Sequence, residues 1–339
     1  RMGADPHAVL FGQAHGLAHH RWVGRVKAAS DVGDGNQRHD AGVISAFIYS
    51  VGFTHIAIEI DGHCRYFLPV QGPWLQSKDH HKACQAGPPA TGAGAGEMHG
   101  NVMNILVLQH IAVEHPGVWR DFMRAGDVAW DAVELDAGES LPSLDGYDAL
   151  ISMGGPMDVF DEAEHPWLRN EKAIIHEAVR ERAMPYLGVC LGHQLLADAL
   201  DGEVTRMNVP EVGLMEVSLT SAGRSDPLFA GLDERLACLQ WHSCEIGTAP
   251  TGSEILAVSD LCPVQAIRVG KHAYGLQFHV ELTAETVIEW ASVPAYEQSL
   301  ENALGSGALT RLDAEIAANL PEFNATAKRI YENFIALLP

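Results

Sequence analysis

The segment that most constrains the fold of this 339-residue chain is PYLGVCLGHQLLADAL, at residues 185–200. A short apolar run ends in Gly188-Val189-Cys190-Leu191-Gly192, and a helical pattern of apolar residues follows at once. A glycine on either side of one side chain is typical of a sharp strand–turn–helix elbow, because Cβ atoms at those positions would clash. The pattern therefore predicts that Cys190 lies between the end of a strand and the start of a helix.

Two interpretations of Cys190 follow from this position. The unpaired N–H groups and the positive dipole end of the following helix favour the thiolate, which is the nucleophilic form of cysteine. The alternative is a buried cysteine that packs as a small apolar residue, as most cysteines do. The elbow by itself leaves both interpretations open.

A candidate base lies downstream in the alternating segment YGLQFHVE, residues 274–281. We expect this segment to be a strand that ends in His279-Val280-Glu281, and alternation along a strand places His279 and Glu281 on the same face. The carboxylate can then orient the imidazole, and the imidazole can accept the thiol proton of Cys190. A His-x-Glu sequence alone is weak, but together with the elbow it favours a catalytic cysteine.

A third motif is the Gly154-Gly155-Pro156 turn, which follows an apolar segment at residues 148–153. Glycines at the carboxyl end of a parallel strand allow backbone N–H groups to approach a ligand closely. One such N–H, together with that of Leu191, would form an oxyanion hole for a tetrahedral intermediate. Taken alone, the motif is equally an ordinary Gly-Pro turn.

The hydrophobic pattern beyond residue 103 predicts an α/β fold. Strands alternate with helices as far as Cys190, which indicates a mostly parallel sheet with helices on both faces and ligands at the carboxyl ends of its strands. Residues 203–278 are rich in alternating segments and predict an antiparallel extension. The expected strands are 105–108, 130–135, 149–153, 212–219, 236–241, 255–259, 264–269 and 272–278; the expected helices are 118–124, 167–182, 312–320 and 325–338.

Residues 1–100 differ from the rest of the chain. They hold ten of the 18 histidines and few periodic stretches, apart from hints of strands at 43–68. A Gly/Pro/Ala-rich linker follows at 86–97. We expect residues 1–100 to be disordered or a non-native leader, residues 101–290 to form the main domain, and residues 291–339 to form a helical extension.

Composition limits the partners and the compartment. The net charge is −22, and residues beyond 100 carry 36 acidic against 14 basic side chains, which argues against nucleic acid or an anionic membrane as a partner. The six cysteines have no dense regular spacing, so we expect no disulfide scaffold, no metal site and no cofactor. A working thiolate requires a reducing compartment, and the first twenty residues contain no apolar segment typical of a signal peptide. We therefore expect a cytoplasmic protein.

The motifs, in this order, resemble the class I (triad) glutamine amidotransferases, and in particular stand-alone proteins similar to the amidotransferase domain of GMP synthase. The segments that carry the resemblance are GGP at 154–156, GVCLGHQLL at 188–196 and GLQFHVEL at 275–282. The resemblance covers about residues 103–290. It implies a flavodoxin-like three-layer fold with a central sheet.

The resemblance also implies a role for each motif residue. Cys190 would be the nucleophile, His279 the general base and acid, and Glu281 the residue that orients His279. The N–H groups of Gly155 and Leu191 would form the oxyanion hole, and the substrate would be bound by Gly154, Gln194, Trp241 and His242. His193 is interpreted as structural. Such relatives usually have Trp-His-Gly-Asp where this chain has Trp241-His242-Ser243-Cys244, which leaves substrate preference and partner coupling open.

These inferences predict an enzyme that hydrolyses the amide of glutamine or of another γ-glutamyl compound through a glutamyl thioester. No ATP-binding motif typical of a synthase domain is present, so either a separate synthase subunit takes the ammonia or the protein is a γ-glutamyl peptide hydrolase of catabolism. Two alternatives remain open: a non-catalytic regulatory or binding subunit, or else a cysteine-based redox or chaperone protein of related fold.

Overall fold

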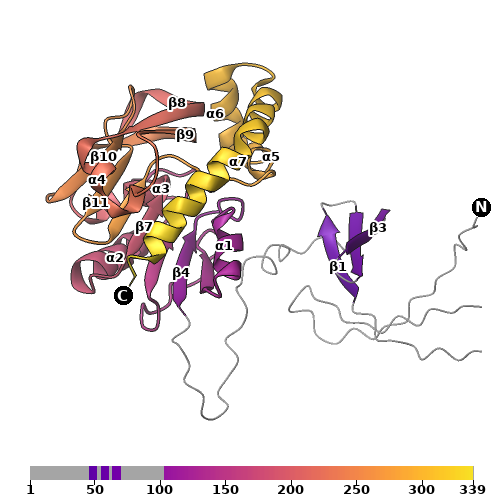
Figure 1. Cartoon of the computed structure of the whole chain (residues 1–339), viewed down its shortest axis with the longest axis horizontal. Helices are drawn as coiled ribbons and strands as arrows, with labels where there is room; N and C mark the ends of the chain where they lie inside the picture. Colours follow the sequence, from indigo (N-terminus) through magenta and orange to yellow (C-terminus); the bar gives the residue numbers. More distant parts are fainter. Residues whose placement is uncertain (1–45, 52–54, 61–62, 70–102, 339) are drawn as a thin grey trace, which may run out of the picture. The chain divides into compact units, whose positions relative to one another are not determined.

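The computed structural model describes residues 103–338 and, before them, only three strands. These strands, β1 (Ala46–Val51), β2 (His55–Ile60) and β3 (His63–Pro69), form an antiparallel sheet (Figure 1). They fall in the segment where the sequence hints at strands. The predicted linker at 86–97 and the other residues of the expected leader lie outside the described residues. The chain divides into two compact units, residues 1–85 and 86–339.

The second unit is built on a nine-stranded sheet in the order β5-β4-β6-β7-β12-β11-β10-β8-β9. The first five strands in this order run parallel, and each later neighbour pairs antiparallel. This arrangement confirms the predicted mostly parallel sheet with an antiparallel extension. The strands are β4 (Asn104–Gln109), β5 (Ala129–Glu134), β6 (Ala149–Ser152), β7 (Tyr186–Val189), β8 (Glu203–Leu219), β9 (Arg235–Thr248), β10 (Ser253–Val258), β11 (Ala266–Val269) and β12 (Ala273–Leu276).

Helices cover both faces of the parallel strands, because side chains of one strand alternate between two cores. In β4, Ile105 and Val107 belong to one apolar cluster, and Leu106 and Leu108 belong to the other. The helices are α1 (Trp119–Ala125), α2 (Trp167–His176), α3 (Leu191–Ala199), α4 (Ser221–Ser225), α5 (Thr286–Ala291), α6 (Pro294–Leu304) and α7 (Ala308–Ile335). The predicted helix over 167–182 is present as α2 followed by a π-helical turn, Glu177–Glu181.

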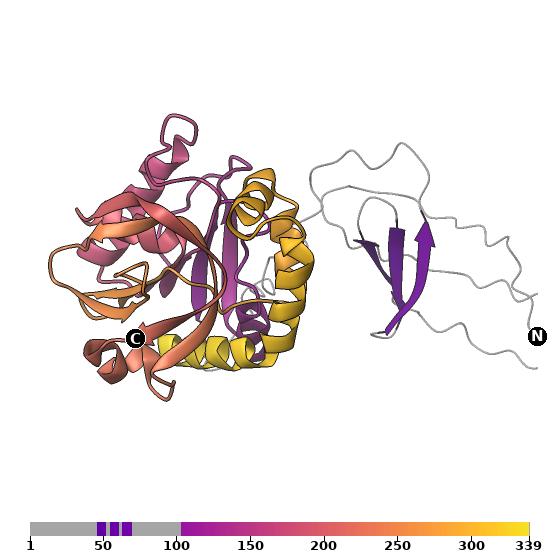
Figure 2. The same cartoon turned by 90° about the horizontal axis from the view of Figure 1, so that it is seen from above.

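The C-terminal region contradicts one expectation. Two helices, 312–320 and 325–338, were expected, but a single helix, α7, runs through Pro321. Proline removes one helical hydrogen bond, yet apolar residues before and after it are buried: Ile316 and Phe323 in a third cluster with α5 and α6, and Ile330 in the core of the sheet. Packing on both sides of Pro321 therefore keeps the helix continuous. Figure 2 shows these helices, in gold and yellow, along two sides of the parallel strands, with a bend where the gold part passes into the yellow C-terminal part.

Candidate active site

Cys190 lies at the elbow between β7 and α3 with a strained backbone. Its φ is 52° and its ψ is −104°, a left-handed conformation that is costly for a residue with a Cβ atom. Its backbone N–H donates to the carbonyl oxygen of Leu276 of β12, at 2.8 Å. The neighbouring strand therefore helps to hold the turn that presents the thiol.

The glycines on either side of Cys190 are sterically required, as the sequence predicts. A Cβ atom at Gly188 would lie 2.3 Å from the carbonyl oxygen of Gly192, and one at Gly192 would lie 2.1 Å from the carbonyl oxygen of Ser152. Both are backbone clashes that a side-chain rotation cannot relieve. The elbow therefore packs directly against the end of β6, where the Gly-Gly-Pro motif begins.

His279 and Glu281 form a buried pair. Nδ1 of His279 donates to Oε1 of Glu281 at 2.7 Å, since a carboxylate oxygen only accepts. Burial lowers the pKa of His279, but the charge of Glu281, the neighbouring Cys190 and the hydrogen bond to Glu281 raise that pKa well above its ordinary value. The edge of the Trp290 ring packs on the imidazole, with ring centroids 4.7 Å apart. The imidazole is therefore held in one orientation.

Cys190 lies beside this imidazole. The Cys190 side chain contributes to the raised pKa of His279, so the two side chains are neighbours. Within the described part of the chain, the buried Nε2 of His279 forms no hydrogen bond of normal geometry. With Nδ1 donating to Glu281, Nε2 is the ring atom available to accept a thiol proton.

The backbone around the pair differs from the expected strand. β12 ends at Leu276, three residues before His279. His279 is instead held by an isolated antiparallel bridge to Leu239, with N–H to carbonyl distances of 2.9 and 3.0 Å. The carbonyl oxygen of Glu281 accepts from Val118 N–H at 2.8 Å, and a Cβ atom at Gly117 would lie only 1.6 Å from that oxygen. Contacts from β9 and from the loop before α1 therefore replace strand pairing.

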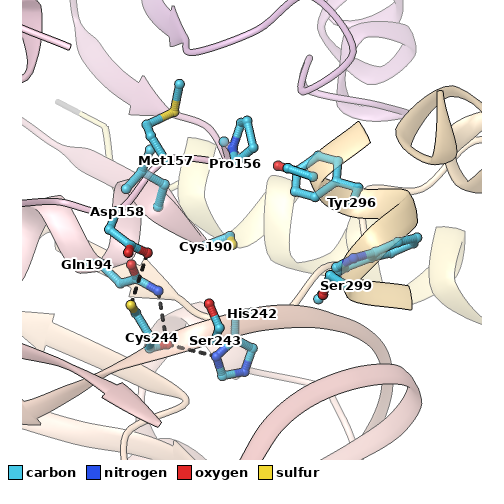
Figure 3. A pocket seen from close by; sticks show the side chains of 14 residues that line it. Pro156, Met157, Asp158, Cys190, Gln194, His242, Ser243, Cys244, Tyr296 and Ser299 are labelled. Atoms are coloured by element: carbon cyan, nitrogen blue, oxygen red, sulfur yellow. Dashed lines mark hydrogen bonds between the residues drawn. The ribbon is translucent and has the colours of Figure 1, made fainter. Parts of the chain in front are cut away.

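A cavity of about 100 Å³ opens next to Cys190 (Figure 3). Its walls come from the Gly-Gly-Pro loop, the start of α3, the middle of β9 and helix α6. The residues that line it are Gly155, Pro156, Met157, Asp158, Cys190, Leu191, Gln194, Trp241, His242, Ser243, Cys244, Ala295, Tyr296 and Ser299. The elbow and the Gly-Gly-Pro motif are thus brought to one place, whereas His279 and Glu281 do not line the cavity.

Two of the predicted substrate-binding residues are occupied by internal contacts. Nε2 of Gln194 donates to the carbonyl oxygen of Cys244 at 3.1 Å and to Oε1 of Gln277 at 3.0 Å, which leaves its own Oε1 as the group it can offer a ligand. The ring nitrogens of His242 face the carbonyl oxygen of Cys244 and Oε2 of Glu211, at 2.9 and 3.0 Å. His242 therefore forms part of the wall, with both ring nitrogens already in contact with the protein.

The other two predicted substrate-binding residues differ in position. Trp241 lines the cavity and packs against the rings of Trp290 and Tyr296. Gly154 does not line it. Instead, a Cβ atom at Gly154 would lie 2.6 Å from Oε2 of Glu114. His193 is buried on α3, with Nε2 3.3 Å from the carbonyl oxygen of Val264.

Gly155 and Leu191, the predicted oxyanion-hole residues, are neighbours. A Cβ atom at Gly155 would lie 3.0 Å from Cδ2 of Leu191, and both residues line the cavity. Among the described residues, neither backbone N–H donates a hydrogen bond to another group of the protein. Two unused donors therefore lie close to the Cys190 thiol.

The Ser243-Cys244 departure has a structural counterpart in Asp158. The thiol of Cys244 donates to Oδ1 of Asp158 at 3.1 Å, and both residues line the cavity (Figure 3). Burial and the hydrogen bond to Asp158 raise the pKa of Cys244 to about 12, so this thiol is a donor and not a nucleophile at neutral pH. A carboxylate is therefore present in the cavity, supplied from the segment after Gly-Gly-Pro rather than from position 244.

The sequence did not reveal the contribution of Asp158, Glu114 or Tyr296. Tyr296 belongs to α6, more than one hundred residues beyond Cys190, and its hydroxyl donates to Oε1 of Glu114 at 2.5 Å. Burial raises the pKa of Glu114, and the nearby His279 partly opposes that rise. Only the packing of α6 onto the cavity brings these groups together, and no motif signals it. Asp158, two residues after Pro156, was close enough to the motif to be considered.

Other kinds of site find no support within the described part of the chain. No group of three or more His, Cys, Asp or Glu side chains there is arranged to hold a metal ion. None of the helices in that part has the length and apolar character needed to cross a membrane. What lines the cavity is a cysteine and two residues with unused backbone N–H groups, Gly155 and Leu191. The carboxylate-oriented imidazole of His279 lies beside the cysteine but outside this lining. Together these are groups that acyl transfer can use.

Comparison with known proteins relates the chain to glutamine amidotransferases. The family model described as glutamine amidotransferase class-I matches residues 120–287. The chain is 34% identical over 191 residues to the glutamine amidotransferase-like protein YfeJ of Salmonella typhimurium, an alignment that covers 55% of this chain and 78% of that one. It is 33% identical over 153 residues to a subunit of the glutamine-hydrolysing GMP synthase of Sulfolobus acidocaldarius, covering 45% and 77% of the two chains.

Solved structures give the same result. A glutamine amidotransferase from Thermotoga maritima superposes with a TM-score of 0.62 at 28% identity, over 69% of this chain and 98% of that one. A glutamine amidotransferase from Methylobacillus flagellatus superposes with a TM-score of 0.61, also at 28% identity, over 70% and 96%. On these grounds the chain belongs to the class I glutamine amidotransferase family.

Proposed function

We propose that the protein hydrolyses the γ-amide of glutamine, or of another γ-glutamyl compound, with Cys190, His279 and Glu281 as its catalytic triad. The observation that carries the proposal is the buried 2.7 Å hydrogen bond between His279 and Glu281 beside the thiol of a strained elbow. A cysteine that served only as packing would need neither an oriented imidazole nor a cavity.

The reaction has two halves. In the first, the sulfur of Cys190 attacks the amide carbon while Nε2 of His279 takes the thiol proton. The carbonyl oxygen becomes an oxyanion near the N–H groups of Gly155 and Leu191. When the C–N bond breaks, His279 returns the proton to the leaving nitrogen, so that ammonia or an amine departs and a γ-glutamyl thioester remains.

In the second half, water replaces the amine. His279 accepts a proton from the water as its oxygen attacks the thioester carbon. The C–S bond then breaks, glutamate leaves and the proton returns to sulfur. Throughout, Glu281 stabilises the imidazolium form of His279, in agreement with the raised pKa of that residue.

Recognition of the glutamyl group is assigned to Asp158 and Gln194. The α-ammonium of a glutamyl compound needs an acceptor, and the Asp158 carboxylate lines the cavity with its side chain 17% exposed. The free Oε1 of Gln194 offers a second acceptor. Arg206, which pairs with Asp158 at 2.5 Å and is 67% exposed, lies on the outer side of this carboxylate and balances its charge.

The destination of the nitrogen has two candidates. The name of one relative describes part of a glutamine-hydrolysing synthase, and by that likeness a separate synthase subunit would receive ammonia from this chain. The second candidate is release to water, as in a γ-glutamyl peptide hydrolase.

The test is glutamate release by the purified full chain from glutamine, γ-glutamyl amines and glutathione-like peptides. The proposal predicts turnover that Cys190→Ser removes almost completely, because the nucleophile is lost. Cys262→Ser is the matched control, since the Cys262 thiol donates to the carbonyl oxygen of Val264 and does not line the cavity; it should retain turnover. Equal turnover by the wild type and Cys190→Ser would contradict the triad.

A further inference from the structure

A buried histidine that the proposed mechanism does not use lies directly behind the Gly-Gly-Pro loop. His110 follows β4 and is fully buried. Its Nδ1 lies 2.8 Å from the carbonyl oxygen of Gly154. Since a carbonyl oxygen only accepts, Nδ1 carries a proton and donates it to this contact.

The contact fixes more than one carbonyl group. The C=O of Gly154 and the N–H of Gly155 belong to the same peptide unit, which is planar and trans, so the two bonds point in opposite directions. Holding the oxygen toward His110 therefore turns the Gly155 N–H away from His110. Gly155 is close to both His110 and Leu191: a Cβ atom there would lie 2.8 Å from Cβ of His110 and 3.0 Å from Cδ2 of Leu191. Gly155 and Leu191 line the cavity, whereas His110 does not, so an N–H that points away from His110 is available to the cavity.

The peptide needs a fixed contact because Gly154 and Gly155 are consecutive glycines. Glycine adopts positive and negative φ with similar ease, so the peptide between Gly154 and Gly155 can rotate at little cost. A rotated peptide would present a carbonyl oxygen to the cavity, where it would repel an oxyanion. A fixed donor on the Gly154 oxygen favours the productive orientation.

The other side of the imidazole is fixed as well. Nε2 of His110 lies 3.0 Å from both carboxylate oxygens of Glu171, and the hydroxyl of Ser152 donates to Oε1 of Glu171 at 2.9 Å. Trp167 stacks on the ring, with centroids 5.6 Å apart and planes 23° apart. Ser152 ends β6 and Gly154 follows two residues later, so Glu171 and His110 together hold both ends of this short connection.

The pKa of His110 agrees with an ion pair between His110 and Glu171. Burial lowers the pKa of His110, but the charge of Glu171 and its hydrogen bond raise the pKa above its ordinary value. Both ring nitrogens face oxygen atoms that only accept hydrogen bonds, so both donate. A buried ion pair is weak evidence of a role in stability, because desolvation offsets much of its attraction. The contact of His110 with the Gly-Gly-Pro loop is stronger evidence of its role.

We propose that His110, held by Glu171, is a positioning residue that keeps the Gly155 N–H aimed at the oxyanion of the reaction. The inference rests on the proposed function. Its chemistry is the non-covalent stabilisation of the tetrahedral intermediate on Cys190, and His110 touches neither the substrate nor the reacting atoms.

Two variants of His110 separate its two contacts. Asparagine places a side-chain amide nitrogen where Nδ1 of histidine lies, so His110→Asn retains a donor to Gly154 and loses the contact with Glu171. Glutamine places its amide nitrogen where Nε2 lies, so His110→Gln retains a donor to Glu171 and loses the contact with Gly154. The inference predicts that His110→Gln has the lower activity. A purely structural role of the ion pair predicts the opposite order, with His110→Asn the more impaired variant.

Three measurements on the full chain identify the affected step. For His110→Gln we expect kcat for glutamine hydrolysis to fall about 10–100-fold, somewhat less than the roughly 10²–10³ observed when an oxyanion donor is removed outright, with KM nearly unchanged. The affinity for glutamate γ-semialdehyde, which forms a thiohemiacetal with Cys190, should fall in proportion. The rate of Cys190 alkylation by iodoacetamide should stay the same, since that displacement forms no oxyanion.

The outcomes are distinct. A wild type without turnover overturns the proposed function and this inference with it. If the wild type has turnover, two results for His110→Gln overturn the inference alone. The first is a kcat equal to that of the wild type. The second is a rate of Cys190 alkylation that falls together with kcat. Should His110→Gln fail to fold, Glu171→Gln replaces it: the ring stays but its anchoring charge is gone. In that case kcat should fall about tenfold with alkylation unchanged, and an unchanged kcat overturns the inference.

Discussion

The hydroxyl of Tyr296 donates a 2.5 Å hydrogen bond to Oε1 of Glu114, joining residues 182 positions apart. One residue belongs to α6 and the other follows β4, and both groups are buried near His279. Helix α6 contributes three of the residues that line the cavity, so it is part of the cavity wall.

This contact predicts a specific loss of stability. Tyr296→Phe keeps the ring but leaves the buried Glu114 carboxyl without its donor, and we expect a loss of about 1–3 kcal/mol in the free energy of unfolding. The measurement is urea denaturation at neutral pH. Tyr331→Phe is the control, since the buried Tyr331 hydroxyl has no hydrogen-bond partner among the described residues; it should change stability by less than about 0.5 kcal/mol. Equal losses in both variants would contradict the role of the contact.

Gly117 packs directly against the backbone of Glu281, so an alanine at position 117 should displace the Glu281 backbone. Gly117 has a φ of 51°, and a Cβ atom would lie 1.6 Å from the carbonyl oxygen of Glu281. We expect Gly117→Ala to lose at least about 3 kcal/mol of stability and most of the turnover. Gly146→Ala is the control: its φ is 87°, with nothing within 4 Å of the added atom, so it should cost about 1–2 kcal/mol and leave kcat unchanged.

The lowered pKa of His193 predicts how the stability of the protein changes with pH. Burial lowers its pKa from 6.5 to about 3, so the folded protein binds fewer protons than the unfolded chain between these values. Stability attributable to His193 is therefore complete above pH 6.5 and is lost as pH falls toward 3, with a slope of up to about 1.4 kcal/mol per pH unit. His193→Gln retains a donor for the carbonyl oxygen of Val264 and cannot be protonated.

The comparison is urea denaturation of wild type and His193→Gln from pH 7 to pH 4. The variant should lose less stability over this range, so the two curves converge as the pH falls. Parallel curves would mean that His193 is not held neutral in the folded protein.

Asp158 predicts selectivity for the α-amino group of the substrate. Asp158→Asn should raise KM for glutamine about 10–100-fold with a small effect on kcat, because a charge-assisted hydrogen bond made equally in ground and transition state is lost. Glutaramic acid, which is glutamine without its α-amino group, should be hydrolysed equally well by both proteins. Asp145→Asn, an exposed carboxylate paired with Arg182, is the control. An equal loss on both substrates would show that Asp158 only shapes the cavity.

The local sequence was sufficient to predict the parallel strands and the elbow. The runs around Ile105, Ala149 and Leu187 are short and apolar, and each forms a strand of the sheet. The tight turn around Cys190 was predictable because a Cβ atom at Gly188 or at Gly192 would clash with the backbone. Two C-terminal helices, 312–320 and 325–338, were predicted where one helix is present, because the local pattern does not record the packing of Ile316 and Phe323 on either side of Pro321.

The rest of the site depends on long-range packing that no local pattern records. His279 was expected on a strand, but its backbone is held by Leu239 of β9 beyond the end of β12. Tyr296 reaches the cavity only because α6 folds back over β8 and β9. The Ser243-Cys244 departure pointed to a segment that lines the cavity, although this segment lies within β9. The carboxylate beside it comes from Asp158, which the sequence alone did not connect with position 244.

The most direct test of the account is labelling of the full chain with a diazo-ketone analogue of glutamine, followed by mass spectrometry of its peptides. We predict one label per chain, on Cys190, suppressed by glutamine and absent in Cys190→Ser. Cys244 lines the same cavity but should stay unlabelled, because its pKa of about 12 keeps it a thiol. A folded protein that takes no label, or that takes it on Cys244 instead, would contradict the assignment of Cys190 as the nucleophile.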